Sequence, residues 1–141
     1  MPLAADLRQL LERLEKLHPF ITSLSVEEAR KIREVIYPEL WGEKEAVANV
    51  EDRFIPGTAV KIQVRVYQPA TNTPLPLLVY FHGGGWATCS VDAYDGLCRA
   101  IANRANCVVV SVNYQLAPEH KFPVAVEDAY AEVAKAIRVA V

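Results

Sequence analysis

The feature that most constrains this chain is a run of three glycines directly after a hydrophobic segment. Leu77–Phe81 is apolar at every position, and it is followed by His82, Gly83–Gly85 and Trp86. A segment that is apolar on both faces is typical of a strand covered by helices on both sides of a sheet. Glycines at the end of such a strand allow backbone conformations that other residues rarely adopt. They also let the backbone come closer to a bound molecule than a side chain would permit.

Two glycine-rich phosphate loops do not fit this stretch. Neither the G-x-G-x-x-G pattern nor the Walker A pattern with its Gly-Lys-Ser/Thr is present, and Trp86 would crowd a phosphate. A purely structural turn remains open. So does an oxyanion hole, in which backbone N–H groups stabilise the negative charge that forms on a carbonyl oxygen during acyl transfer. An open α/β sheet places such amides at the carboxyl ends of its strands.

Hydrophobic periodicity predicts a helical prefix. Leucines recur with helical spacing over residues 3–17, so we expect one apolar stripe that packs on the rest of the chain. Ser25 and Glu28 form a capping box, which predicts a second helix that stops before Pro38. We assign residues 1–45 to a helical cap prefix.

The pattern changes period after the prefix. Residues 47–55 fit a strand, and residues 60–66 fit another, with one solvated face and a place near a sheet edge. An alternation of strand and helix follows, typical of a parallel sheet: strand 77–81, helix 92–105, strand 107–112 and helix 124–141. The fold class is α/β, with antiparallel edge strands before a parallel β-α-β-α unit, and the partial core spans residues 46–141.

Composition excludes several functional classes. A net charge of −2 over 141 residues offers no electrostatic footprint for nucleic acid. The longest apolar runs fall short of the ~20 residues that a membrane helix needs, and the amino terminus lacks the apolar block of a signal peptide.

The chain has three cysteines, Cys89, Cys98 and Cys107, and they form no C-x-x-C pair. We therefore expect no metal site. We expect the cysteines to be small buried hydrophobic residues of a cytoplasmic protein.

Longer motifs give the glycine run a chemical meaning. HGGGW at 82–86 resembles the oxyanion loop of the hormone-sensitive-lipase-like branch of the α/β-hydrolases, and VNYQLAPEHKFPVAVEDAY at 112–130 resembles the segment after its fourth strand. Residues 50–57 and 62–70 are similar to its first two strands. The resemblance implies a serine carboxylesterase or lipase that acts on a small carboxylic ester without a cofactor. The chain departs from the family at Asn113–Gln115, where Asp-Tyr-Arg is usual.

The resemblance also implies roles for individual residues. Gly84 and Gly85 would supply the oxyanion amides and Gly83 would shape the turn, so the three form the candidate oxyanion hole. His82 would orient the loop rather than act as the general base, because the triad histidine comes last in this fold. Trp86 would line the substrate pocket, although a simple packing role remains open.

The family's catalytic triad is missing from the chain. Its chemistry needs Ser, then Asp or Glu, then His, with the serine in G-x-S-x-G. None of the four serines lies in that pattern, and the chain ends at Val141, before the nucleophile strand. We therefore expect an amino-terminal part of the fold that is inactive alone. Its unpaired strand at 77–81 would recruit a complementing carboxy-terminal fragment or form a homo-oligomer. The alternative is a non-catalytic binding or interaction module derived from the same fold.

Overall fold

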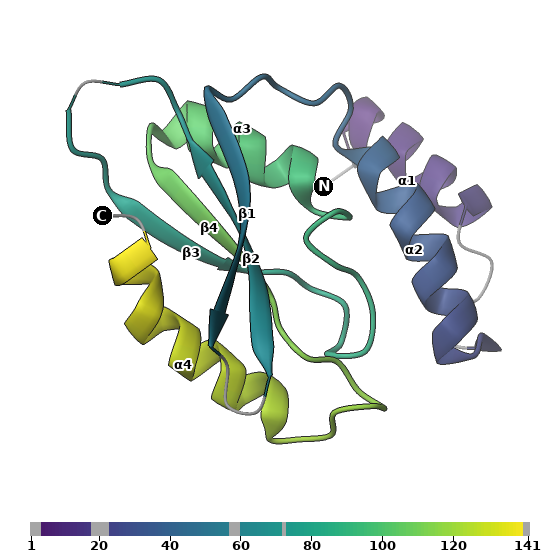
Figure 1. Cartoon of the computed structure of the whole chain (residues 1–141). Coiled ribbons are helices and arrows are strands. Elements are labelled where there is room, and N and C mark those ends of the chain that lie inside the picture. Colours follow the sequence, from purple (N-terminus) through teal and green to yellow (C-terminus); the bar gives the residue numbers. More distant parts are fainter. Residues whose placement is uncertain (1–3, 18–22, 57–59, 72, 140–141) are drawn as a thin grey trace.

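A four-stranded mixed sheet forms the centre of the computed structural model, which describes residues 4–17, 23–56, 60–71 and 73–139 (Figure 1). The strand order is β1-β2-β4-β3, with β1–β2 and β2–β4 antiparallel and β3–β4 parallel. The predicted fold class is therefore confirmed. The elements are α1 (Ala5–Leu17), α2 (Val26–Leu40), β1 (Asn49–Pro56), β2 (Lys61–Gln68), β3 (Leu77–Phe81), α3 (Asp95–Ala105), β4 (Val108–Asn113) and α4 (Val124–Val139).

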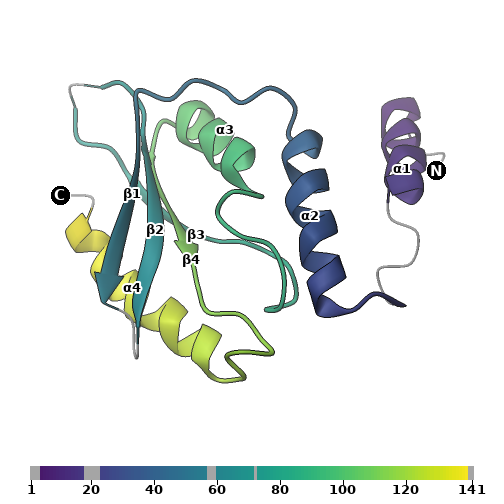
Figure 2. The same cartoon turned by 45° about the vertical axis from the view of Figure 1, so that its right-hand side comes forward.

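Two helices cover the two faces of the sheet. Helix α4 lies on one face and α3 on the other (Figures 1 and 2). Val108, Val110 and Val112 of β4 pack on the side of α4, whereas Val109 packs with Cys98 of α3 on the other side. Because both faces of β4 are covered, its four valines do not alternate with solvated side chains. The three cysteines are free and buried, as the sequence predicts.

The expectation of a solvated face on β2 is wrong for its carboxyl-terminal half. Ile62, Val64 and Val66 are buried as the alternation predicts, but Tyr67 is fully buried and Arg65 is half-buried. The face that carries Arg65 lies against the start of α3 and is closed by ion pairs with acidic side chains there. The predicted place near a sheet edge is confirmed, because β2 is the second strand of the sheet, next to the edge strand β1.

The last strand of the sheet, among the described residues, is β3. It pairs only with β4, and all five of its residues are half-buried. The opposite edge, β1, is rich in charged side chains, which discourage strand pairing. The apolar edge of β3 has no such protection.

The expectation that α2 stops before Pro38 is also wrong, because the helix continues through this proline to Leu40. Proline removes a backbone donor and usually ends a helix. Here tertiary contacts hold the last turn: Tyr37 and Trp41 pack on Tyr94, with ring centroids 5.4 and 5.6 Å from that of Tyr94. The Trp41 indole N–H also donates to a backbone carbonyl in the turn before α3. The capping box of Ser25 is present as predicted.

The first helix lies on the far side of α2 from the sheet (Figure 2). It ends at Leu17 as the sequence predicts, while the His18-Pro19 pair lies outside the described residues. Contrary to expectation, Leu10 and Leu11 are each 43% exposed instead of packed. The boundary between a cap prefix and a core at residue 45 remains a prediction. Over the described part of the chain, no helix is long and apolar enough to cross a membrane.

Candidate functional site

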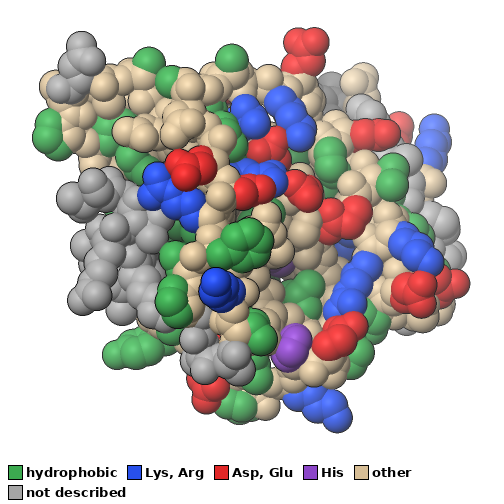
Figure 3. Space-filling model, viewed as in Figure 1, with side chains coloured by type: hydrophobic (Ala, Val, Ile, Leu, Met, Phe, Trp, Pro, Cys, Tyr) green, Lys and Arg blue, Asp and Glu red, His purple; other side chains and the backbone are tan. Residues whose placement is uncertain are grey.

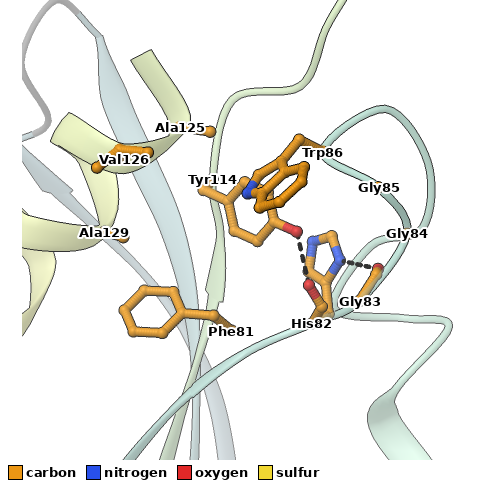
Figure 4. Close-up of a pocket in the computed structure, with 10 residues that line it drawn as sticks. All are labelled: Phe81, His82, Gly83, Gly84, Gly85, Trp86, Tyr114, Ala125, Val126 and Ala129. Atoms are coloured by element: carbon orange, nitrogen blue, oxygen red, sulfur yellow. Dashed lines mark hydrogen bonds between the residues drawn. The ribbon is translucent and has the colours of Figure 1, made fainter. Parts of the chain in front are cut away.

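All five residues that the sequence singles out line one cavity. The cavity has a volume of about 430 Å³ and lies between the carboxyl end of β3 and the first turns of α4 (Figure 4). The glycine loop forms one side, and small and apolar side chains of α4 form the other. Its lining comprises Phe81, His82, Gly83, Gly84, Gly85, Trp86, Tyr114, Ala125, Val126 and Ala129.

The glycine loop has backbone torsions that side chains resist. Gly84 has φ of +134° and Gly85 has φ of +63°. A Cβ on Gly84 would lie 2.1 Å from the carbonyl oxygen of Thr88, so this position cannot accept a side chain without moving the backbone. A Cβ on Gly83 would lie 2.9 Å from the Tyr94 hydroxyl. Close approach of other atoms thus favours glycine at positions 83 and 84, and a positive φ favours it at positions 84 and 85.

Hydrogen bonds to three successive carbonyl oxygens orient the loop. The Tyr114 hydroxyl donates to the His82 carbonyl at 2.6 Å, and the His82 ring nitrogen Nδ1 lies 2.9 Å from the Gly83 carbonyl. The Gly84 carbonyl accepts from both the backbone N–H and the hydroxyl of Thr88, at 3.1 and 2.8 Å. In a planar trans peptide the N–H points away from the preceding carbonyl. The hydrogen bonds to the carbonyls of residues 82, 83 and 84 therefore fix the directions of the N–H groups that follow them. These are the amides of Gly83, Gly84 and Gly85, and each points away from the carbonyl before it.

The His82 ring is buried inside the loop. It is only 3% exposed and stacks between Tyr114 and Tyr94, with ring centroids 4.5 and 5.9 Å away (Figure 4 draws the Tyr114 side). Because a carbonyl only accepts, the bond to Gly83 requires the proton on Nδ1. Burial lowers the pKa of His82, although its bond to the Gly83 carbonyl works in the opposite direction. The ring is thus kept neutral and fixed in the loop.

Trp86 lies at the mouth of the cavity. It has φ of +56°, and its carbonyl accepts from the Ala117 N–H at 2.8 Å. It is 64% exposed, and it also lines a second cavity of about 360 Å³, to which Phe122 and Pro123 contribute. The described part of the chain therefore leaves most of this indole ring uncovered.

Sequence reasoning missed the contribution of α2 to this loop. Arg30 donates to the carbonyl of Ala87 and to that of Ala117, each at 2.8 Å, and forms a two-point contact with Glu119 at 2.7 and 2.8 Å. Arg33, one turn later, donates to the Thr88 hydroxyl at 2.6 Å. The only available signal was the spacing, because residues i and i+3 of a helix share one face.

The Arg30–Glu119 pair predicts a pH response. Hydrogen bonding to Arg30 lowers the pKa of Glu119 to about 2. Since the folded pKa lies below the unfolded one, this contribution to stability is present above about pH 4.5 and is lost as the pH falls toward 2. We expect the Glu119 carboxyl carbon, followed by NMR, to titrate near pH 2, and near pH 4 in Arg30→Gln. A wild-type midpoint close to 4.5 would contradict the pairing.

An ion cluster anchors the start of α3 behind the loop. Asp95 is buried and accepts from Tyr67 at 2.9 Å and from Arg99 at 3.0 Å, and Lys44 lies 2.8 Å away. Burial raises the pKa of the Asp95 carboxyl, but these donors outweigh it and hold the pKa below its usual value. The cluster thereby positions the preceding residue, Tyr94, against the His82 ring.

The departure from the family at Gln115 leaves a hydrogen bond in place. The Gln115 backbone N–H and side-chain amide both donate to the buried Asp128 carboxylate at 3.1 Å. A neutral amide therefore contacts Asp128 where the family's arginine would be expected. Asn113 instead donates to the Gln63 side chain at 3.2 Å.

Charges of both signs are mixed on the face seen in Figure 3, where no large patch of one sign stands out. Among the described residues, no group of three or more His, Cys, Asp and Glu side chains is placed to hold a metal ion.

Comparison with known proteins fits this geometry. A family model described as the alpha/beta hydrolase fold matches residues 78–139. The hyperthermophilic esterase from the archaeon Pyrobaculum calidifontis superimposes with a TM-score of 0.84 at 41% identity, over 100% of this chain and 47% of that one. The chain belongs to the α/β-hydrolases of the carboxylesterase type. The chain superimposes on one part of that fold.

Two curated relatives place the chain in the same family. The arylesterase of Saccharolobus solfataricus is 33% identical over 132 residues, which is 92% of this chain and 42% of the relative. The carboxylic ester hydrolase LipN of Mycobacterium tuberculosis is 49% identical over 83 residues, which is 59% of this chain and 22% of the relative. This α/β-hydrolase chain thus spans less than half the length of the relatives it matches.

Proposed function

We propose that this chain supplies the oxyanion-hole half of a carboxylic ester hydrolase. Gly84 and Gly85 donate their amides to the oxyanion of a bound ester, Gly83 and His82 maintain the turn, and Trp86 contacts the substrate. The nucleophile, acid and base come from residues that this sequence does not contain. The substrate is a small carboxylic ester, in keeping with the esterase relatives.

One observation carries the proposal: hydrogen bonds within the protein fix the orientation of the glycine amides. The preceding carbonyls are all hydrogen-bonded, so no reorganisation is needed when charge develops on the substrate. Fixed donors of this kind account for about 10²–10³ in kcat per donor in acyl-transfer enzymes. The loop also lies at the carboxyl end of a parallel strand, where open α/β sheets bind ligands.

We expect the purified chain to hydrolyse p-nitrophenyl butyrate no faster than an equal mass of albumin. It lacks a nucleophile, so the loop has no tetrahedral intermediate to stabilise. A saturable rate that a fluorophosphonate abolishes would contradict this expectation.

Reconstitution tests the oxyanion role itself. The chain is mixed with the remaining carboxy-terminal part of the Pyrobaculum calidifontis esterase, which provides the matched template. Serine-inhibitor-sensitive hydrolysis is expected. The control pairs that part with the esterase's own amino-terminal part. Activity in the control together with none for this chain would overturn the proposal.

The open edge of β3 is the contact surface proposed for the missing part. Val108 donates its N–H to the Pro76 carbonyl, so alternate residues of β3 face β4 and Val79 directs its N–H to the open side. In the absence of a complement, we expect concentration-dependent self-association at about tens of micromolar. Val79→Pro removes that outward donor and should reduce the association in sedimentation experiments. Monomeric behaviour of the wild-type chain would contradict this prediction.

A binding module derived from the same fold is the second candidate. The observation in its favour is the cavity of about 430 Å³, which exists in a chain without a triad. Stoichiometric binding of ethyl butyrate by the chain alone, combined with failed reconstitution, would favour this candidate over the enzyme half.

A further inference from the structure

We propose that Arg33 of α2 is a positioning residue for the Gly85 amide and acts through the hydroxyl of Thr88. The inference rests on the proposed oxyanion role of the glycine loop. It extends the functional site to the helical prefix, which precedes the sheet in sequence and whose described residues do not line the first cavity.

The relay begins with the direction of the Thr88 proton. A hydroxyl has one proton to donate and can accept elsewhere. Arg33 Nη1, which only donates, lies 2.6 Å from Thr88 Oγ1 and therefore takes up an acceptor position on this oxygen. The proton is then directed to the Gly84 carbonyl at 2.8 Å, since the Cys89 sulfur is a weaker acceptor at 3.8 Å. A charged donor polarises the hydroxyl and strengthens the second bond.

The relay ends at the peptide between Gly84 and Gly85. Two flanking glycines give this peptide plane little torsional resistance of its own, because neither residue has a Cβ. Its orientation depends on what binds the Gly84 carbonyl, and Thr88 provides two of those bonds. When the oxygen is held toward Thr88, the Gly85 N–H is held on the opposite side.

The surroundings of Arg33 support a positioning role. Its Nε is buried and has no hydrogen-bond partner among the described residues. A buried donor without a partner has a cost in free energy, so the position of this guanidinium is not explained by the hydrogen bonding of its own Nε. The adjacent Glu34 accepts from Ser90 at 2.8 Å, which ties the next part of the loop to the same helix. Lys31 on the same helix is exposed and pairs with Glu27, so it provides a matched control.

NMR on the 141-residue chain tests the relay without any ester. The readouts are the carbonyl ¹³C shift of Gly84, and the ¹⁵N shift and order parameter of the Gly85 amide. We expect an order parameter of about 0.85 in the wild type and in Lys31→Met, and below about 0.6 in Arg33→Met and Thr88→Val. Thr88→Ser retains the hydroxyl and should restore the wild-type values.

The double variant Arg33→Met/Thr88→Val provides the decisive comparison. If the two residues act in one relay, its Gly84 and Gly85 shifts match those of Thr88→Val alone. Additive shifts, or an unchanged Gly85 amide in Arg33→Met, would overturn the proposal. Circular dichroism checks folding, and if Thr88→Val unfolds, Arg33→Met and Thr88→Ser decide the result. If Gly85 responds as expected but reconstitution yields no hydrolysis, the positioning stands and the proposed function fails.

Discussion

Replacing Gly84 with alanine is expected to lower the free energy of unfolding by about 3–5 kcal/mol, the range of severe single-site defects. The new Cβ would lie 2.1 Å from the Thr88 carbonyl oxygen and 2.8 Å from its carbon, both backbone atoms that no rotamer change can move. The φ of +134° is in addition a conformation that is essentially restricted to glycine. Urea unfolding followed by circular dichroism measures the change.

Gly85→Ala is the matched control for this variant. No atom lies within 4 Å of the position that its Cβ would take, so only the left-handed φ of +63° opposes the substitution. The expected cost is about 1–2 kcal/mol. Equal losses for the two variants would show that the loop relaxes freely, and that contact with Thr88 does not determine its shape.

Asp95→Ala is expected to have a comparable effect, about 3–5 kcal/mol. Removal of this carboxylate leaves the Tyr67 hydroxyl buried without its acceptor and three cations close together: Lys44, Arg65 and Arg99. The pKa of Asp95 lies below its usual value, so its contribution is present above about pH 4 and declines as the pH falls. The difference between variant and wild type should therefore shrink in acid.

Asp92→Ala is the control for charge alone. Asp92 also pairs with Arg65, at 2.7 Å, but its side chain is exposed. Exposed pairs contribute about 0–1 kcal/mol. A loss for Asp92→Ala as large as that for Asp95→Ala would mean that burial is not what makes Asp95 important. We expect Asp95→Ala, but not Asp92→Ala, to perturb the Tyr94 and His82 ring signals in NMR spectra.

Local pattern predicted most elements of the fold and failed where contacts across the chain decided the outcome. The apolar runs at β3 and β4 predicted buried strands because both faces are covered by helices. The alternation in β2 could not reveal that Arg65 meets acidic groups from β1 and from the start of α3. Nor could it show that α2 continues through Pro38, because the aromatic contacts that hold that turn come from Tyr94.

In the candidate site, too, the sequence predicted some features and only the structure revealed others. The position of the glycines after a strand predicted a backbone binding loop, and five neighbouring residues, 82–86, do line one cavity. Tyr114 lies in a quoted motif, but nothing in that motif indicated its bond to the His82 carbonyl. The bonds from Arg30 and Arg33 join residues 55 to 89 positions apart.

The sequence by itself determined where the chain can bend and where it must be buried, because glycine torsions and hydrophobic periodicity are local properties. It thus specified an α/β arrangement with a glycine-rich loop at the end of β3. Only the tertiary structure decided which carbonyls of that loop are held and by which side chains. The physical reason is that a hydrogen bond depends on the distance and direction between groups, and the packing of α2 and α3 against the loop sets both.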